Sequence, residues 1–328
     1  MSKFVLSGDF GKFESVMLGR DVSLTKEDLK LVRFRTKMYN LADGFVEREG
    51  NDTYLTEVDG NQYLVGAQGQ IKSYDTSKTN LLHKLACYTA ITQFLTPGSK
   101  NNEIYMTLAC PLSVLNIQEA KDEYKSYLQG KGAIKIKVNE EEYEFEIKDI
   151  TIKAEGSGIL YTNPELFVNK TTLITDLGGL NLSGSLYINK SCKKEDRFIE
   201  ECGSDELVNI VQEQLSIYNK GNLISLDIAE KALNDGGLKK SGKLDANSIE
   251  YIDKAKNNYF NEVLGFIKKH KINIDFIDQL VFVGGTTLHI QKLIESNLPH
   301  AYVPEESELS TVRGLYKVAY KKYSAIVK

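Results

Sequence analysis

Short runs in which apolar and polar residues alternate predict strands in the first third of the chain. The first three runs are Phe4–Leu6, Ser15–Leu18 and Leu31–Met38. Asp59-Gly60 suits a type I′ turn and lies between two further strand-like segments, Thr53–Thr56 and Gln62–Val65. The chain therefore opens with two β-hairpins, and the first of them closes through the glycine-containing turn GDFGKF.

Apolar residues at helical spacing come next. Between Asn80 and Leu95 they predict a helix that Pro97-Gly98 ends. Ile104–Cys110 indicates a buried strand, and Ser113–Leu128 indicates a helix with Ser113 as its N-cap. Further strands are expected before the turn EGSG that begins at position 155, at Ile134–Val138, Glu142–Ile147 and Ile150–Lys153.

The opening pattern returns in the second half of the chain. Thr172–Thr175 runs into DLGGLNLSGSLYI, which predicts a strand, a glycine turn and a second strand. Asp9 and Asp176 both lie at a strand end, with a glycine two residues later, and they are about half the chain apart. The economical interpretation is a duplicated architecture, in which two α/β domains present equivalent hairpins to a shared cleft.

The remaining pattern is mostly helical. Helices are expected at Asp205–Ser216, Leu226–Ala232, Ser248–His270, His289–Ser296 and Leu309–Ala325, with one buried strand at Gln279–Val283. The segment from Asn234 to Gly242 is rich in glycine and lysine, which favours a flexible insertion.

Composition narrows the class of protein. A length of 328 residues, with 41% hydrophobic and 26% charged residues, fits a folded chain of two domains. The formal charge of −4 predicts no direct binding of nucleic acid, and no apolar run approaches the roughly 18 residues of a membrane span. The four cysteines are widely spaced, which favours reduced thiols in a cytoplasmic protein and argues against a zinc site.

Glycine-rich hairpins are suited to phosphate groups. Small residues let backbone N–H groups approach phosphate oxygens, and a neighbouring carboxylate can hold Mg²⁺. Two such hairpins could grip the phosphates of one nucleotide, with Asp9 and Asp176 flanking the metal. The turn GGTT at 284–287 follows a buried strand and could seat the nucleoside.

These motifs together resemble the actin-like ATPase superfold, and within it the ParM/StbA-type plasmid-segregation proteins. GDFGKF is similar to the first phosphate loop of that family, DLGGLNLS to its second, and VFVGGTTL to its adenosine motif. CPLS, QYLVG, GSDEL and VRGLY stand where the family has a strand end, a hairpin strand, a pocket helix and the second inter-domain connection. The resemblance covers nearly the whole chain.

The resemblance implies ATP as the bound nucleotide, with GTP as the alternative, and Mg²⁺ held by Asp9 and Asp176. Glu155 occupies the position of a glutamate that orients the attacking water, so the implied catalytic residues are Glu155, Asp176 and Asp9. The implied nucleotide-binding residues are Gly11, Lys12, Phe13, Gly178, Gly179, Leu180, Asn181, Gly203, Glu206, Gly284, Gly285, Thr286 and Thr287.

Three positions depart from the family pattern. Val16 stands where the first loop usually has a phosphate-contacting lysine, and Lys12 is the candidate replacement. In the second loop, Asn181 and Ser183 occupy the last two polar positions, so one carboxylate near the metal is missing.

The resemblance implies two actin-like domains, each with a core and an outer lobe, around a nucleotide cleft. We expect residues 1–157 plus 311–328 to form the first and residues 158–310 the second. The expected function is a cytoplasmic ATPase that polymerises with itself and segregates plasmid DNA through a DNA-binding adaptor protein. The alternatives are a small-molecule kinase of the same superfold and a nucleotide-binding structural protein with little turnover.

Overall fold

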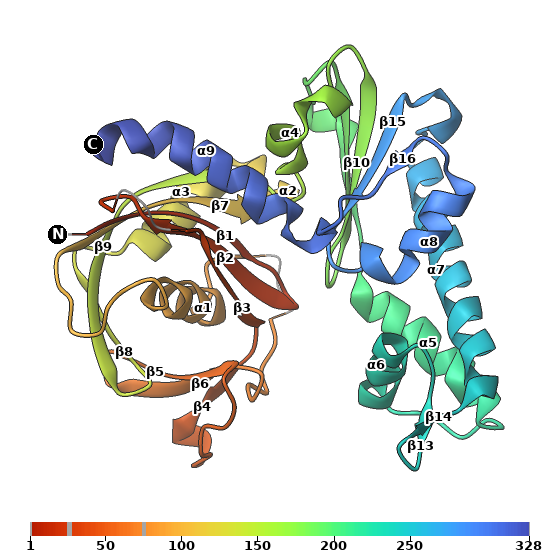
Figure 1. The fold of residues 1–328 in the computed structure, drawn as a ribbon, viewed down its shortest axis with the longest axis horizontal. Coiled ribbons are helices and arrows are strands. Elements are labelled where there is room, and N and C mark those ends of the chain that lie inside the picture. Colours follow the sequence, from red (N-terminus) through yellow and green to blue (C-terminus); the bar gives the residue numbers. More distant parts are fainter. Residues whose placement is uncertain (1, 25–27, 74–76, 328) are drawn as a thin grey trace. The chain divides into compact units, whose positions relative to one another are not determined.

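The chain folds into two compact units, which Figure 1 shows as ribbons coloured along the sequence. The computed structural model describes residues 2–24, 28–73 and 77–327. Unit 1 contains Met1–Asn163 and Leu309–Lys328, and unit 2 contains Pro164–Glu308. Each unit has its own sheet and its own hydrophobic core.

Unit 1 is built on a nine-stranded mixed sheet. Its strands lie in the order β3 (Lys30–Arg35), β2 (Glu14–Asp21), β1 (Lys3–Phe10), β7 (Asn102–Cys110), β9 (Glu141–Ala154), β8 (Ile134–Val138), β5 (Thr53–Val58), β6 (Asn61–Gly66) and β4 (Met38–Asn40). β1 and β2 form the first predicted hairpin, and β7 and β9 run parallel to β1. Asp59 and Gly60 both have positive φ, as the type I′ turn between β5 and β6 requires.

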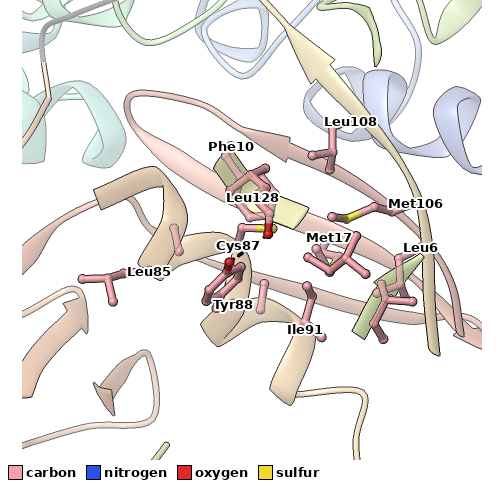
Figure 2. Close-up of a cluster of buried hydrophobic side chains, with 14 of the residues drawn as sticks. Leu6, Phe10, Met17, Leu85, Cys87, Tyr88, Ile91, Met106, Leu108 and Leu128 are labelled. Atoms are coloured by element: carbon pink, nitrogen blue, oxygen red, sulfur yellow. Dashed lines mark hydrogen bonds between the residues drawn. The ribbon is translucent and has the colours of Figure 1, made fainter. Parts of the chain in front are cut away.

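The main core of unit 1 surrounds helix α1 (Leu81–Thr92), which is buried along most of its length. The sheet curves around this helix, so that α1 contacts β1 and β2 on one side and β5, β6 and β8 on the other (Figure 1). Figure 2 shows Leu85, Tyr88 and Ile91 packed among side chains from the strands. The Tyr88 hydroxyl donates to the Leu128 carbonyl oxygen at 2.8 Å, which satisfies the one polar atom of this ring.

Helix α9 (Ser310–Val327) covers the opposite face of the same strands. Val5, Val16 and Leu18 pack beneath it, and the Ser7 hydroxyl donates to the Val312 carbonyl oxygen at 2.8 Å. α9 also crosses the short helix α4 (Ile159–Thr162). The C-terminal segment is therefore part of unit 1, although it follows unit 2 in the sequence.

Unit 2 repeats the central part of this sheet. Its strands lie in the order β12 (Arg197–Glu200), β11 (Leu182–Ile188), β10 (Thr171–Leu177), β15 (Gln279–Val283) and β16 (Ala301–Tyr302). The pairing directions are those of β3-β2-β1-β7-β9: two antiparallel pairs followed by two parallel pairs. This equivalence confirms the duplication predicted from the two Asp-x-Gly motifs. Four helices complete the unit: α5 (Ser204–Tyr218), α6 (Leu226–Asp235), α7 (Ile249–Lys269) and α8 (Thr287–Asn297).

Four predictions were wrong in detail. The two strands expected at Glu142–Ile147 and Ile150–Lys153 form the single strand β9. The strand expected at Leu31–Met38 is broken after Arg35, and β4 pairs with β6 instead of continuing β3. The helix expected at Ser113–Leu128 is two helices, α2 (Leu112–Leu115) and α3 (Gln118–Gln129), and Ser113 lies inside the first rather than at its N-cap. The flexible insertion expected after Asn234 contains the end of α6 and a small hairpin, β13 (Lys239–Lys240) with β14 (Lys243–Leu244).

Within the ranges that the structure describes, no helix combines the length and the apolar character that a bilayer crossing requires.

Glycine at position 314 permits an unusually close backbone contact. A Cβ added to Gly314 would lie 1.9 Å from the Gly158 carbonyl oxygen, a backbone atom that no rotamer change can remove. We therefore expect Gly314→Ala to destabilise the chain, although alanine is the better helix former by about 1 kcal/mol. Gly265→Ala in α7 is the matched control: a Cβ there meets nothing within 4 Å, so this variant should be more stable by about 0.5–1 kcal/mol. Denaturant unfolding of both variants measures whether each change raises or lowers the free energy of unfolding. A Gly314→Ala variant that is more stable than the wild type would contradict the close contact.

Candidate functional site

Each unit carries an aspartate beside a glycine turn, in the same place in its sheet. In unit 1 Asp9 lies one residue before the end of β1, and in unit 2 Asp176 lies one residue before the end of β10. The Gly11 N–H donates to the Glu14 carbonyl at 3.0 Å, and the Gly178 N–H donates to the Asn181 carbonyl at 2.9 Å. The same hydrogen bond thus closes both hairpins.

A buried lysine joins the first turn to Glu155. Lys78 has a relative exposure of only 2%, and its Nζ lies 2.5 Å from the Phe10 carbonyl oxygen and 3.1 Å from Glu155 Oε1. The Glu155 side chain is 25% exposed, so the pair lies at the margin of the core. Burying an ammonium group is costly unless such partners compensate it.

Glu155 takes its position from the sheet. It follows the last residue of β9, and its N–H donates to the carbonyl of Cys110 at the end of the parallel strand β7 at 3.0 Å. The chain then turns through Ser157, whose hydroxyl donates to the Ala154 carbonyl at 2.7 Å. Carboxyl ends of parallel strands meet at one sheet edge, which is where ligands bind in α/β sheets.

The carboxyl group of Asp9 has an unusually high pKa. Burial raises its pKa from the ordinary 3.8 to about 7, and the negative charges of Glu155 and Glu14 raise it as well. The positive charge of Lys78 acts in the opposite direction. A carboxyl group with such a pKa is poised to lose its proton when a cation approaches.

His83, on the first turn of α1, is neutral. Burial lowers its pKa to about 2, and the nearby charges of Lys78 and Lys12 lower it further. Its Nδ1 lies 2.8 Å from Oδ1 of Asn80, the residue that caps α1. His83 therefore packs beside the first turn as an uncharged ring.

The remaining predicted residues of the first turn are partly buried. The Lys12 ammonium lies 3.4 Å from the Ser73 hydroxyl oxygen. The Phe13 ring lies under the guanidinium group of Arg35, at 3.6 Å from its centroid, and the Phe13 carbonyl accepts from the Thr36 N–H. Gly11, Lys12 and Phe13 thus form a turn that is anchored on both sides.

In unit 2, the second glycine turn is joined to the start of α5. The N–H groups of Ser204 and Asp205 donate to the carbonyls of Gly178 and Gly179, both at 3.0 Å, and Gly203 N–H donates to Leu180 at 3.1 Å. A Cβ on Gly203 would lie 2.4 Å from the Gly179 carbonyl oxygen, so only glycine allows this approach.

Because its carbonyls point toward α5, the turn leaves amide groups facing elsewhere. Among the described residues, neither the Gly179 N–H nor the Leu180 N–H has an acceptor. Successive unpaired amides of this kind form an anion-binding concavity. Asn181, which the sequence also assigned here, supplies the carbonyl that closes the turn.

The GGTT turn lies beside the same hairpin. The Thr286 hydroxyl donates to the Gly178 carbonyl at 2.9 Å, and the Thr287 hydroxyl donates to the Val283 carbonyl at 2.7 Å, so both side chains hold the turn in place. Gly284 has a φ of +93°, and a Cβ there would lie 2.6 Å from Asp176 Oδ1. Gly285 is exposed to solvent, whereas Thr286 and Thr287 are buried.

Glu206, on the first turn of α5, lies near a second carboxyl group. Burial raises the pKa of Glu262 on α7, and the negative charge of Glu206 raises it further. Two acidic side chains therefore share one region of unit 2, and one of them, Glu206, lies on the first turn of α5.

The carboxylates fit a magnesium ion that is bound mainly through phosphate and water. Mg²⁺ characteristically uses only one or two protein carboxylates in nucleotide sites. The described residues contain no cluster of three or more potential metal ligands, so an all-protein cage is absent from that part of the chain. Asp9 in unit 1 and Asp176 in unit 2 each offer one carboxyl group at a strand end, and one carboxylate is a number that suits such coordination within either unit.

The structure brings the predicted residues of each unit together. Asp9 and Glu155 lie near enough to interact electrostatically, and the 178–181, 203–206 and 284–287 segments are linked by hydrogen bonds. Sequence reasoning missed Lys78. Its signal was weak, because a lysine two residues before a helix cap is ordinary, and only the fold places it beside Phe10 and Glu155.

Comparison with known proteins identifies the class. Residues 13–158 match the family model described as the N-terminal domain of actin like proteins. The Alp12 filament structure is 44% identical in sequence and has a TM-score of 0.72. The match covers 98% of the present chain and 100% of the Alp12 chain. An ADP complex of Ta0583, an archaeal actin homologue, is 14% identical with coverages of 98% and 100% and a TM-score of 0.72. The apo ParM protein of psk41 is 15% identical, with full coverage of both chains and a TM-score of 0.71.

No curated protein sequence matches the chain. The 44% identity to Alp12 over nearly the full length nevertheless shows the family: the chain belongs to the actin-like proteins. The predicted actin-like fold is confirmed, and so is the similarity in fold to a ParM protein.

The raised pKa of Asp9 has a consequence for stability. The folded chain binds this proton more tightly than the unfolded chain, so this group's contribution is present below about pH 4 and is lost as the pH rises through about 7. Asp9→Asn removes the penalty, and we expect it to be more stable than the wild type at pH 8 by on the order of 2 kcal/mol, with a smaller difference at pH 5.

Denaturant unfolding of both proteins at the two pH values tests this expectation. The difference between the proteins is the quantity to compare, because His83 has a lowered pKa and contributes a slope of opposite sign in both. If the difference in unfolding free energy between the two proteins does not depend on pH, the pKa of Asp9 is not raised by burial.

Proposed function

We propose that the chain is a nucleotide-dependent ATPase in which both glycine hairpins bind phosphate. The observation that carries this proposal is the repeated hairpin, with one aspartate and one closed glycine turn in each unit. The unpaired amides of Gly179 and Leu180 offer donors to phosphate oxygens. The ADP complex of the archaeal homologue Ta0583 supports a nucleotide as the ligand of this fold.

Asp9 and Asp176 are the residues that would hold Mg²⁺, directly or through water. The bound ion would neutralise charge on the phosphates. The raised pKa of Asp9 suits this role, because the carboxyl group can lose its proton near neutral pH when a cation binds beside it. Gly285, exposed at the GGTT turn, would face the nucleoside.

Glu155 is the residue that would orient the attacking water. Phosphoryl transfer needs positioning and charge stabilisation more than covalent help from the protein, so one acceptor in the right place is sufficient. The carboxylate of Glu155 is partly exposed and is held through Oε1 by Lys78. It can therefore accept a hydrogen bond from water without changing its own position.

We propose that the ATP-bound chain assembles into filaments. The Alp12 filament structure, 44% identical, supports this property. The motifs that resemble the ParM/StbA-type proteins favour a role in plasmid segregation. A formal charge of −4 disfavours direct contact with DNA, so an adaptor protein would make that contact. Head-to-tail contacts that do not close generate such filaments.

The role of the GGTT turn can be tested with Gly285→Val. A Cβ at this position has only the Glu308 Cβ nearby, at 3.9 Å, so the variant should fold normally. The branched side chain would occupy space at the exposed turn, and we expect ATP affinity to fall by at least about tenfold, or 1.4 kcal/mol. Titration calorimetry gives the affinity, and the melting temperature without nucleotide is the control. Unchanged affinity would remove the turn from the site.

Glu155→Gln separates nucleotide binding from hydrolysis. We expect phosphate release to fall by roughly 10²–10⁴-fold, because the amide cannot orient water as the carboxylate does. Nucleotide affinity should be nearly kept, and filaments should last longer because the γ-phosphate is retained. Phosphate release and pelleting are measured on the same samples. Filaments that disassemble at the wild-type rate despite blocked hydrolysis would separate turnover from filament lifetime.

A further inference from the structure

The buried ammonium group of Lys78 contacts two segments of the candidate site, the first glycine turn and Glu155. We propose that Lys78 is a positioning residue of the hydrolytic site: it fixes the Glu155 carboxylate against the turn that ends β1. The inference rests on the proposed ATPase function and adds a residue to it. Its basis is the geometry of three segments that are far apart in the sequence and meet at one nitrogen atom.

The backbone around Lys78 is rigidly held. The Thr79 N–H donates to the Ser77 hydroxyl at 3.1 Å, and the Asn80 side-chain amide donates to the Ser77 carbonyl at 3.0 Å. Asn80 also caps α1 by accepting from the His83 N–H at 3.1 Å. Lys78 thus projects from a closed turn that is attached to the most deeply buried helix of unit 1.

The ammonium group connects the turn to the catalytic candidate. One donor binds the Phe10 carbonyl, one residue after Asp9, and another lies 3.1 Å from Glu155 Oε1. An ammonium has three donors, and a carboxylate has two oxygens. With Oε1 held by Lys78 and the side chain 25% exposed, the second oxygen of Glu155 remains to accept from water.

Stability alone is a weak reason for this arrangement. A buried ion pair contributes little compared with an apolar side chain of the same volume, because desolvation offsets the attraction. Methionine has nearly the length of lysine and would fill the same space. A charge at this position therefore points to a role in holding Glu155.

Neither position 16 nor Lys12 takes the place of Lys78 in the contacts described above. Position 16 is a valine, which is 6% exposed and packs with the side chains beneath α9. Lys12 lies on the turn itself, with its ammonium at the Ser73 hydroxyl. Lys84→Met is the matched control, because it removes a lysine from α1, where the ammonium lies over the rings of Tyr88 and Tyr127, without touching the contact to Glu155.

The test compares Lys78→Met with Lys84→Met and Glu155→Gln in the whole 328-residue chain. We expect Lys78→Met to bind a non-hydrolysable ATP analogue within about threefold of the wild type and to release phosphate roughly 10²-fold more slowly. Its unliganded melting temperature should stay within about 5 °C of the wild type. Lys84→Met should retain most of the phosphate release, and Lys78→Arg, which keeps the charge, should recover most of what Lys78→Met loses.

The double variant Lys78→Met/Glu155→Gln tests whether the two residues act as a unit. If Lys78 acts through Glu155, the double variant releases phosphate no more slowly than the slower single variant. Multiplicative losses would contradict the inference, because they would mean that Lys78 acts separately.

Three other outcomes would also overturn the inference. Wild-type phosphate release in Lys78→Met, with wild-type Glu155 still required, removes Lys78 and leaves the ATPase function in place. A Lys78→Met chain that does not fold makes Lys78 a structural residue. A wild-type chain that binds the analogue but releases no phosphate overturns both the inference and the proposed hydrolysis.

Discussion

The hydrogen bond that closes each glycine hairpin is the constraint on which the candidate site depends. It fixes the turn immediately after a buried strand and so sets the position of Asp9 in unit 1 and Asp176 in unit 2. Within each sheet, the strand order then brings other strand ends to the edge that carries the turn. In unit 1 these include the end of β9, just before Glu155. Local turn geometry and sheet topology together place the two aspartates, and long-range side-chain contacts such as that between Lys78 and Glu155 then hold the neighbouring groups.

The first turn gathers acidic side chains at a cost in folding stability. Asp9, Glu14 and Glu155 bring negative charge to one region, and burial raises the pKa of Asp9 to about 7. Lys78 compensates part of this charge from inside the core. Carboxylates gathered in this way are costly in the unliganded chain, and a bound cation relieves the cost. Sites of this kind are generally built at the expense of stability.

Much of this arrangement could be predicted from the sequence, because its signals are local. Asp59-Gly60 and the two Asp-x-Gly turns identify hairpins directly. The helix break at Asn116 could not be predicted, since the apolar spacing continues across it. Lys78 was missed because its role arises only when α1 packs inside the curved sheet and brings the residue to Phe10. Long-range contacts of this kind leave no periodic signal in the chain.

The most direct test of the account is the thermal stability of the wild-type chain with nucleotide. A ligand that binds only the folded state at 100 times its dissociation constant should add about 2.7 kcal/mol of stability. We predict a clear rise in melting temperature with Mg²⁺ and ATP together, and a much smaller rise with ATP and a chelator, because the proposed site binds phosphate with the help of a cation held by Asp9 and Asp176. An unchanged melting temperature at saturating Mg²⁺ and ATP would contradict nucleotide binding at the two hairpins.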